Sequence, residues 1–196
     1  MGSAFPEIHL VRHGETEWSA TGKHTGRTDI ALTAAGEAAA RRLHARLQGL
    51  PVAAVWSSPS QRARETCRLA GFGAEGAVDP DLAEWDYGAY EGLTTKQILA
   101  ARPGWQLFRD GCPDGESVAD IGARADRVVA RLRRLGRDAL LFSSAHFLRV
   151  LAARWLGLPP QAGALLVLDT ASLSLLGYEH DLDEPVLRRW NLVQPE

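Results

Sequence analysis

Short apolar segments alternate with longer helix-like segments along this chain, and this alternation limits the folds that it can adopt. The apolar runs at 8–11, 52–56 and 139–142 have the length and composition of buried strands. Helical patterns separate them, which is typical of an α/β fold with a largely parallel sheet. Functional groups in such a sheet are expected beyond the carboxyl ends of the strands.

Local signals predict where several elements begin and end. Thr33 is expected to cap a helix that runs to about residue 50, and Ser117 opens a capping-box pattern for a helix over 118–135. Further strands are predicted at 165–168, 172–178 and 186–190, the last two as an antiparallel edge pair. Residues 71–81 form a glycine-rich connection, and residues 103–115 form a looser stretch that could be part of a substrate lid.

The predicted strand ends bring chemically useful residues to one edge. Arg12 and His13 follow the first strand, and Ser144 follows a late one. Ser58, just past the second strand, is expected to cap a helix, with Pro59 at its first position. Arg62 then lies in the first turn, where amide groups already favour an anion. The sequence therefore predicts a phosphate pocket.

Composition limits the class of protein. With 196 residues and 45% hydrophobic content, residues 1–196 are expected to form one domain. A net charge of −2 and a pI near 6.3 argue against a nucleic-acid partner. No apolar stretch approaches a membrane span, and residues 1–6 are too short and polar for a signal peptide, so we expect a cytoplasmic protein that binds no membrane. A homodimer is left open. Cys67 and Cys112 are expected to be reduced structural thiols.

Four segments together resemble the histidine phosphatase superfamily over nearly the whole chain: Arg12-His13-Gly14-Glu15-Thr16, Ser57-Ser58-Pro59-Ser60-Gln61-Arg62-Ala63, Glu84-Trp85-Asp86-Tyr87-Gly88 and Ser143-Ser144-Ala145-His146. The resemblance implies a phosphoglycerate mutase-like α/β fold, a three-layer sandwich in which helices flank a mostly parallel sheet. It also implies that His13 becomes a phosphohistidine, that Arg12 and Arg62 grip the phosphoryl oxygens, and that Glu84 is the acid/base. Glu91 is a weaker second candidate.

Other positions are expected near the pocket. By the resemblance, Ser19 stands where relatives carry a phosphate-contacting asparagine, and Thr25-Gly26 matches a pair in the substrate loop. His24 either lines the rim or is a solvated loop histidine. Structural roles are expected for three further histidines, which are His9, His44 and His180. Two arginines supply positive charge and no acidic or histidine cluster has ligand spacing, so we predict a metal-independent reaction without a cofactor.

The late segment departs from the family pattern. Aligned on Leu148-Arg149, Ser144 stands where the resemblance implies a second pocket histidine, and His146 lies two residues beyond. A serine hydroxyl cannot supply the charge of an imidazolium, and such a loss typically costs about 10²–10³ in rate. Side chains two residues apart lie on the same face of a strand but diverge where the strand ends, so His146 is not expected simply to take over the role of the missing histidine. His146 nevertheless stays a candidate to compensate. Ala145 in place of glycine adds a Cβ where unusual backbone torsions are expected.

The resemblance implies a phosphate monoester hydrolase for a small phosphorylated metabolite, with activity reduced or altered by Ser144. Residues 84–92, 109–112 and 183–185 are similar to the branch that contains fungal sedoheptulose-1,7-bisphosphatase, so a sugar phosphate is the leading substrate. Only about 60 residues separate Glu84 from Ser144, which disfavours a phosphoglycerate mutase, since mutases usually carry a longer shielding insert. Two alternatives stay open: a pseudo-phosphatase that binds a phosphorylated ligand, or a repurposed enzyme of the same fold.

Overall fold

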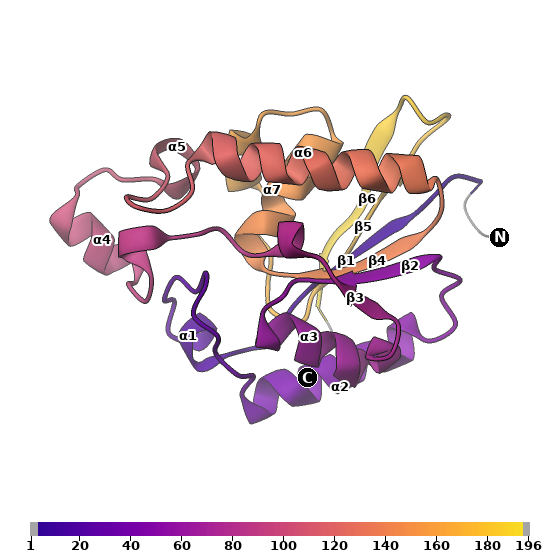
Figure 1. Ribbon diagram of the computed structural model, residues 1–196, viewed down its shortest axis with the longest axis horizontal. Coiled ribbons are helices and arrows are strands. Elements are labelled where there is room, and N and C mark those ends of the chain that lie inside the picture. Colours follow the sequence, from indigo (N-terminus) through magenta and orange to yellow (C-terminus); the bar gives the residue numbers. More distant parts are fainter. Residues whose placement is uncertain (1–3, 194–196) are drawn as a thin grey trace.

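A six-stranded sheet forms the centre of the computed structural model, which describes residues 4–193 (Figure 1). The strands are β1 (Ile8–Arg12), β2 (Ala54–Ser57), β3 (Gly76–Val78), β4 (Ala139–Ser143), β5 (Leu173–Tyr178) and β6 (Pro185–Leu192), in the order β3-β2-β4-β1-β5-β6. The first four in this order are parallel, and β5 and β6 are antiparallel to their neighbours. The predicted mostly parallel sheet and the antiparallel edge pair are confirmed.

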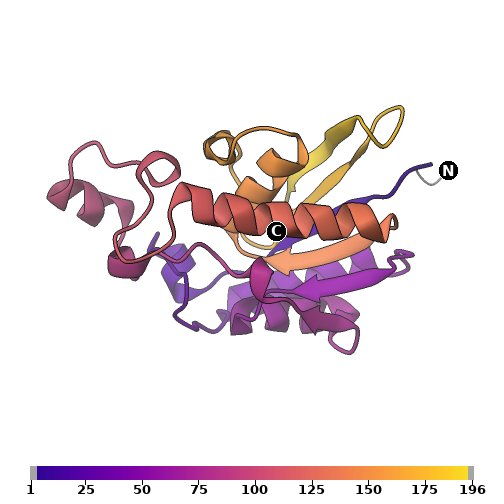
Figure 2. The same cartoon turned by 45° about the horizontal axis from the view of Figure 1, so that its top comes forward.

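Helices cover both faces of the sheet, which explains why most side chains of its central strands β1 and β4 are apolar and buried. Leu10 and Leu141 pack into the core on the side of α6 (Val118–Leu135) and α7 (Ala145–Trp155), whereas Val11 and Phe142 pack on the side of α2 (Ala34–Leu47). Figure 2 shows α6 on one side of the sheet and α2, drawn in purple, on the opposite side. The three-layer arrangement is therefore confirmed, and it leaves the ends of the strands for function.

The shorter helices lie mainly in the connections: α1 (Glu17–Ala20), α3 (Gln61–Cys67), α4 (Thr95–Ala101) and α5 (Leu107–Asp110), the π-helical η1 (Arg68–Phe72), and the 3-10 helices η2 (Pro80–Leu82), η3 (Gly88–Tyr90) and η4 (Pro160–Leu165). The predicted caps of α2 and α6 are confirmed: Thr33 accepts from the Gly36 amide, and Ser117 forms the capping box with Asp120. The first of these helices ends at residue 47, three residues early.

The helix after β2 begins later than predicted. Ser60, not Ser58, is the residue before the first turn of α3, and its side chain makes no capping hydrogen bond. The Ser58 hydroxyl accepts from the Ser60 amide, while Asp29, from a distant loop, accepts from the Gln61 amide at 2.7 Å. A long-range partner thus takes the capping role, and Arg62 remains in the first turn.

Other sequence predictions are corrected as well. Residues 165–168 are not a strand, because η4 ends at Leu165 and the next residues are irregular, with Leu165 83% and Val167 67% exposed. The connection at 71–81 contains β3, and the late strand ends at Ser143.

The stretch 103–115 is better packed than a loose lid. It contains α5, and Trp105, Phe108 and Cys112 are buried in the core. Figure 2 places α4 and α5 at the end of the molecule toward which the arrows of β2 and β4 point. Cys67 and Cys112 are unpaired and lie in separate hydrophobic clusters, as expected. Within residues 4–193, no helix is both long and apolar enough to cross a bilayer.

Candidate active site

His13 lies in the turn that follows β1, and its ring has one defined hydrogen bond. Nδ1 is 2.7 Å from the carbonyl oxygen of Gly14, so Nδ1 carries the proton and Nε2 keeps a free lone pair. The side chain is buried, and burial lowers the pKa of His13 well below 6.5; the charges of Arg12 and Arg62 lower it further. At neutral pH this is a neutral imidazole with its nucleophilic nitrogen available.

Arg12 and Arg62 are held by backbone carbonyls. Arg12 donates through Nη1 to the carbonyl oxygen of Leu168, which lies in the segment that was wrongly predicted as a strand. Arg62, fully buried, donates through Nη1 to Thr28 and through Nη2 to Thr25 and Gly26. Burial lowers the pKa of both guanidinium groups and the charge of Glu84 opposes this effect, but an arginine remains charged at neutral pH. Both cations are therefore fixed in place.

Three buried polar atoms have no hydrogen-bond partner within residues 4–193. They are Nε of Arg12, Nε of Arg62 and Oγ of Ser144. Buried polar groups in folded proteins nearly always have a partner, so each unpaired atom calls for an explanation. All three belong to residues for which the sequence predicts phosphate contact. Arg12 lines the cavity at His13, where an oxyanion could accept from it, whereas Arg62 and Ser144 do not line that cavity.

Glu84 is anchored by the first turn of α7. Its Oε1 accepts from the backbone amides of Trp85 and Phe147 at 2.9 and 2.8 Å, and its Oε2 accepts from the amide of His146 at 3.1 Å. The positive end of the helix macrodipole adds to this attraction. Oε1 accepts two of these bonds, so Oε2 has more capacity for a further partner.

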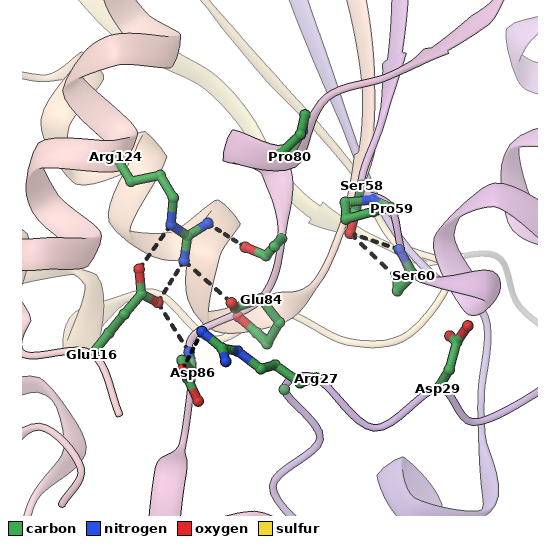
Figure 3. A pocket seen from close by; sticks show the side chains of 12 residues that line it. Arg27, Asp29, Ser58, Pro59, Ser60, Pro80, Glu84, Asp86, Glu116 and Arg124 are labelled. Atoms are coloured by element: carbon green, nitrogen blue, oxygen red, sulfur yellow. Dashed lines mark hydrogen bonds and ion pairs between the residues drawn. The ribbon is translucent and has the colours of Figure 1, made fainter. Parts of the chain in front are cut away.

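A buried arginine that sequence reasoning missed clamps the segment carrying Glu84 (Figure 3). Arg124 of α6 pairs with both carboxylate oxygens of Glu116 and donates to the carbonyls of Asp81, Ala83 and Glu84. Arg124, Glu116 and Glu84 line a second cavity of about 470 Å³, which is distinct from the cavity that His13 lines. One sequence signal existed: residue 124 falls within the apolar face of α6, where an arginine is unusual.

The late segment has a different local structure from the one predicted. Ser144 caps α7 by position, without a side-chain hydrogen bond, and is fully buried. Ala145 is the first residue of the helix and has no positive φ, so the expected backbone strain at this position is wrong. His146 belongs to the first turn of α7, not to a strand, and its Nδ1 is 2.6 Å from the hydroxyl of Tyr87.

The substrate-loop residues have distinct positions. The Ser19 hydroxyl is held in the capping box of α1, although Ser19 and Thr25 line the cavity at His13. Gly26 lines the second cavity, where a Cβ would lie 2.6 Å from the Trp85 carbonyl oxygen. Glu91, the weaker acid/base candidate, instead accepts from the Gly26 and Thr28 amides.

His24 is buried, so the solvated-loop interpretation is wrong. Its ring centroid lies 4.7 Å from that of Tyr87, and its Nε2 lies 3.3 Å from the Thr95 hydroxyl. His9 lies within β1, His44 contacts the carbonyl of Ala70, and His180 is exposed beyond β5, all outside this site.

A cavity of about 270 Å³ unites most of the predicted site residues. Its lining includes Arg12, His13, Glu84, Ala145 and His146. Arg62 lies behind its wall, because it donates to the carbonyl of Thr25, which lines the cavity. In the part of the chain that the structure describes, no group of three or more histidine, cysteine or acidic side chains could hold a metal ion.

The chain is an α/β protein whose cavity beyond the end of β1 is lined by a cation, Arg12, and such a cavity can hold an anion. More narrowly, the chain belongs to the histidine phosphatase superfamily (branch 1), whose family model matches residues 8–193. It is 44% identical over 185 residues to an acid phosphatase of Mycobacterium tuberculosis, covering 92% of this chain and 90% of that one. It is 36% identical over 193 residues to sedoheptulose 1,7-bisphosphatase of Saccharomyces cerevisiae, covering 82% and 71%. A solved structure of an open-reading-frame product of M. tuberculosis superimposes with a TM-score of 0.90 at 41% identity, covering 96% and 98%.

Proposed function

We propose that this protein hydrolyses phosphate monoesters of small metabolites through a phosphohistidine at His13. The observation that carries the proposal is the neutral, buried imidazole of His13, whose Nδ1 is held by Gly14 and whose Nε2 is free. Two fixed arginines supply charge for the phosphoryl oxygens. Relatives named acid phosphatase and sedoheptulose 1,7-bisphosphatase support the reaction class. A sugar phosphate is the leading substrate class, and a cytoplasmic setting is part of the proposal.

The reaction proceeds in two displacements. Nε2 of His13 attacks phosphorus, a P–N bond forms as the ester P–O bond breaks, and Glu84 gives a proton to the leaving oxygen. Water then attacks the phosphohistidine, the P–N bond breaks, and Glu84 recovers a proton from that water. Oε2 of Glu84 fits this role, because it accepts only one of the three amide hydrogen bonds. The chain's own cations provide the charge, so no metal is required.

The alternative is a pseudo-phosphatase or repurposed pocket that binds a phosphorylated ligand without this turnover. Ser144 favours it, because its hydroxyl lacks a partner and carries no charge where the family resemblance implies a histidine. A phosphoglycerate mutase is less favoured, because the segment after Glu84 is short.

Phosphate release from p-nitrophenyl phosphate and a panel of sugar phosphates tests the proposal, with metal chelated throughout. The unmodified protein should release phosphate, and His13→Ala should abolish it. His180→Ala is the matched control, because His180 is an exposed histidine away from the cavity, and it should retain full activity. Tight binding of orthovanadate without any turnover would favour the pseudo-phosphatase, and equal turnover in His13→Ala would refute the mechanism.

A further inference from the structure

A tyrosine and a histidine are in contact beside Glu84, and the two displacements above give neither a role. The Tyr87 hydroxyl lies 2.6 Å from Nδ1 of His146. Tyr87 is buried, and its hydroxyl has no other hydrogen-bond partner within the described residues. The contact joins the segment that carries Glu84 to the first turn of α7, whose amides hold the Glu84 carboxylate.

The surroundings decide which atom donates. Burial raises the pKa of Tyr87 well above 10, and the charge of Glu84 adds to this effect, so the phenol keeps its proton. Burial lowers the pKa of His146 well below 6.5, with further lowering by Arg149, so the ring is neutral. A buried hydroxyl proton without an acceptor would be costly. The hydrogen-bond network therefore assigns Tyr87 as the donor to Nδ1, which leaves the ring proton on Nε2.

Nε2 of His146 is then an N–H donor without a protein acceptor. None of residues 4–193 makes a hydrogen bond with it, while His146 lines the same cavity as Arg12 and His13. The His146 backbone amide donates to Oε2 of Glu84, and Nδ1 lies 4.0 Å from the same oxygen. The backbone amide thus ties the first turn of α7 to the acid/base carboxylate, and the Tyr87 hydroxyl is the hydrogen-bond partner of the imidazole itself.

We propose that His146 is a catalytic residue whose Nε2–H donates to the transferring phosphoryl group, and that Tyr87 is the positioning residue that holds the ring for it. The inference rests on the proposed function. The Nε2–H of His146 supplies a neutral hydrogen-bond donor to a pocket in which Ser144 stands where the family resemblance implies a histidine. Two steps link Tyr87 to the substrate: its hydroxyl fixes Nδ1, and the ring directs the opposite nitrogen into the cavity.

Nitrogen-15 NMR of the histidine rings in the full-length protein tests the arrangement without any turnover. His146→Gln assigns the His146 signals by their loss. In the unmodified protein, the chemical shifts should show that Nδ1 is unprotonated and hydrogen-bonded and that Nε2 is protonated. Tyr87→Phe should remove the change in the Nδ1 chemical shift that the hydrogen bond causes. Addition of orthovanadate should change the chemical shift of Nε2–H. Tyr90→Phe is the control, because Tyr90 packs on Trp105 and its hydroxyl makes no hydrogen bond with any of residues 4–193, and it should change nothing.

Kinetics test the catalytic part. His146→Ala should lower kcat by about 10²-fold, His146→Gln should recover part of this loss because its amide can also donate, and Tyr87→Phe should lower kcat by about 10-fold with little change in KM. A protonated Nδ1, or an Nδ1 shift unaffected by Tyr87→Phe, would overturn the positioning role. Unchanged kcat in His146→Ala would overturn the catalytic role. If the unmodified protein turns nothing over, the proposed function fails, while the vanadate shift of Nε2–H still decides whether His146 contacts the phosphoryl group.

Discussion

Replacing Arg124 by methionine should both destabilise the protein and impair the site at Glu84. The Arg124 and Glu116 side chains are 10% and 21% exposed, and the guanidinium also serves three backbone carbonyls of residues 81–84. Removing one partner of a buried ion pair typically costs about 3–5 kcal/mol, because the other charge is left without compensation. We expect a loss in this range for Arg124→Met.

The matched control is Arg127→Met on the same helix. Arg127 also pairs with a carboxylate, that of Asp81 at 2.7 Å, but its side chain is 58% exposed. Exposed pairs contribute about 0–1 kcal/mol. The two variants thus remove the same side chain from neighbouring positions and differ mainly in burial and in the backbone contacts.

Urea denaturation followed by tryptophan fluorescence measures the loss, and Trp85 reports on the clamped segment itself. Because Arg124 holds the backbone of Glu84, a displacement of about 1 Å should also lower kcat/KM by about 10². Glu116→Leu added to Arg124→Met should recover part of the stability, since it removes the unpaired carboxylate. Equal stability and activity in Arg124→Met and Arg127→Met would refute the clamp.

Three further predictions concern the buried histidines and the pocket. First, burial lowers the pKa of four histidines in the folded protein: His9, His13, His24 and His146. Below pH 6.5 the unfolded chain then binds more protons than the folded protein, so the free energy of unfolding should decrease as the pH is lowered, by up to about 1.4 kcal/mol per pH unit for each histidine. Urea denaturation at pH 5 to 8 measures this free energy, and a rise in stability below pH 6.5 would contradict the account. Second, Ser144→His should raise kcat for phosphate release by about 10², without Ala145→Gly because residue 145 is helical; no gain despite tight vanadate binding would argue for the pseudo-phosphatase. Third, Glu91→Ala should weaken vanadate binding measured by calorimetry by about 10-fold, because the loop that receives Arg62 loses its anchor; an equal effect of Glu37→Ala, an exposed pair on α2, would contradict this.

Local signals in the sequence predicted the local structure. Thr33 and Ser117 cap their helices because the groups involved lie within three residues of each other. The buried strands could be recognised from their apolar residues, since both faces of each central strand are covered. Arg12, His13 and Glu84 could be singled out because they match a family pattern, and Arg12 and His13 also lie at the end of a strand.

Long-range contacts account for what the sequence could not predict. Asp29 takes the capping role assigned to Ser58, and this contact spans 32 residues. The apolar run at 165–168 looked like a strand, but Arg12 and Trp190 take the carbonyls of Leu168 and Val167. The contact of Tyr87 with His146 spans 59 residues. No local pattern encodes such partners.

Trapping the phosphorylated protein tests the central claim most directly. The protein is mixed with a 32P-labelled substrate for milliseconds, quenched in base, and the site of the label is located by mass spectrometry, with His13→Ala as the control. The account predicts a base-stable, acid-labile phosphoryl group on His13 that forms before phosphate is released and is absent from the variant. Phosphate release without such a group, or a label on another residue that persists in His13→Ala, would contradict it.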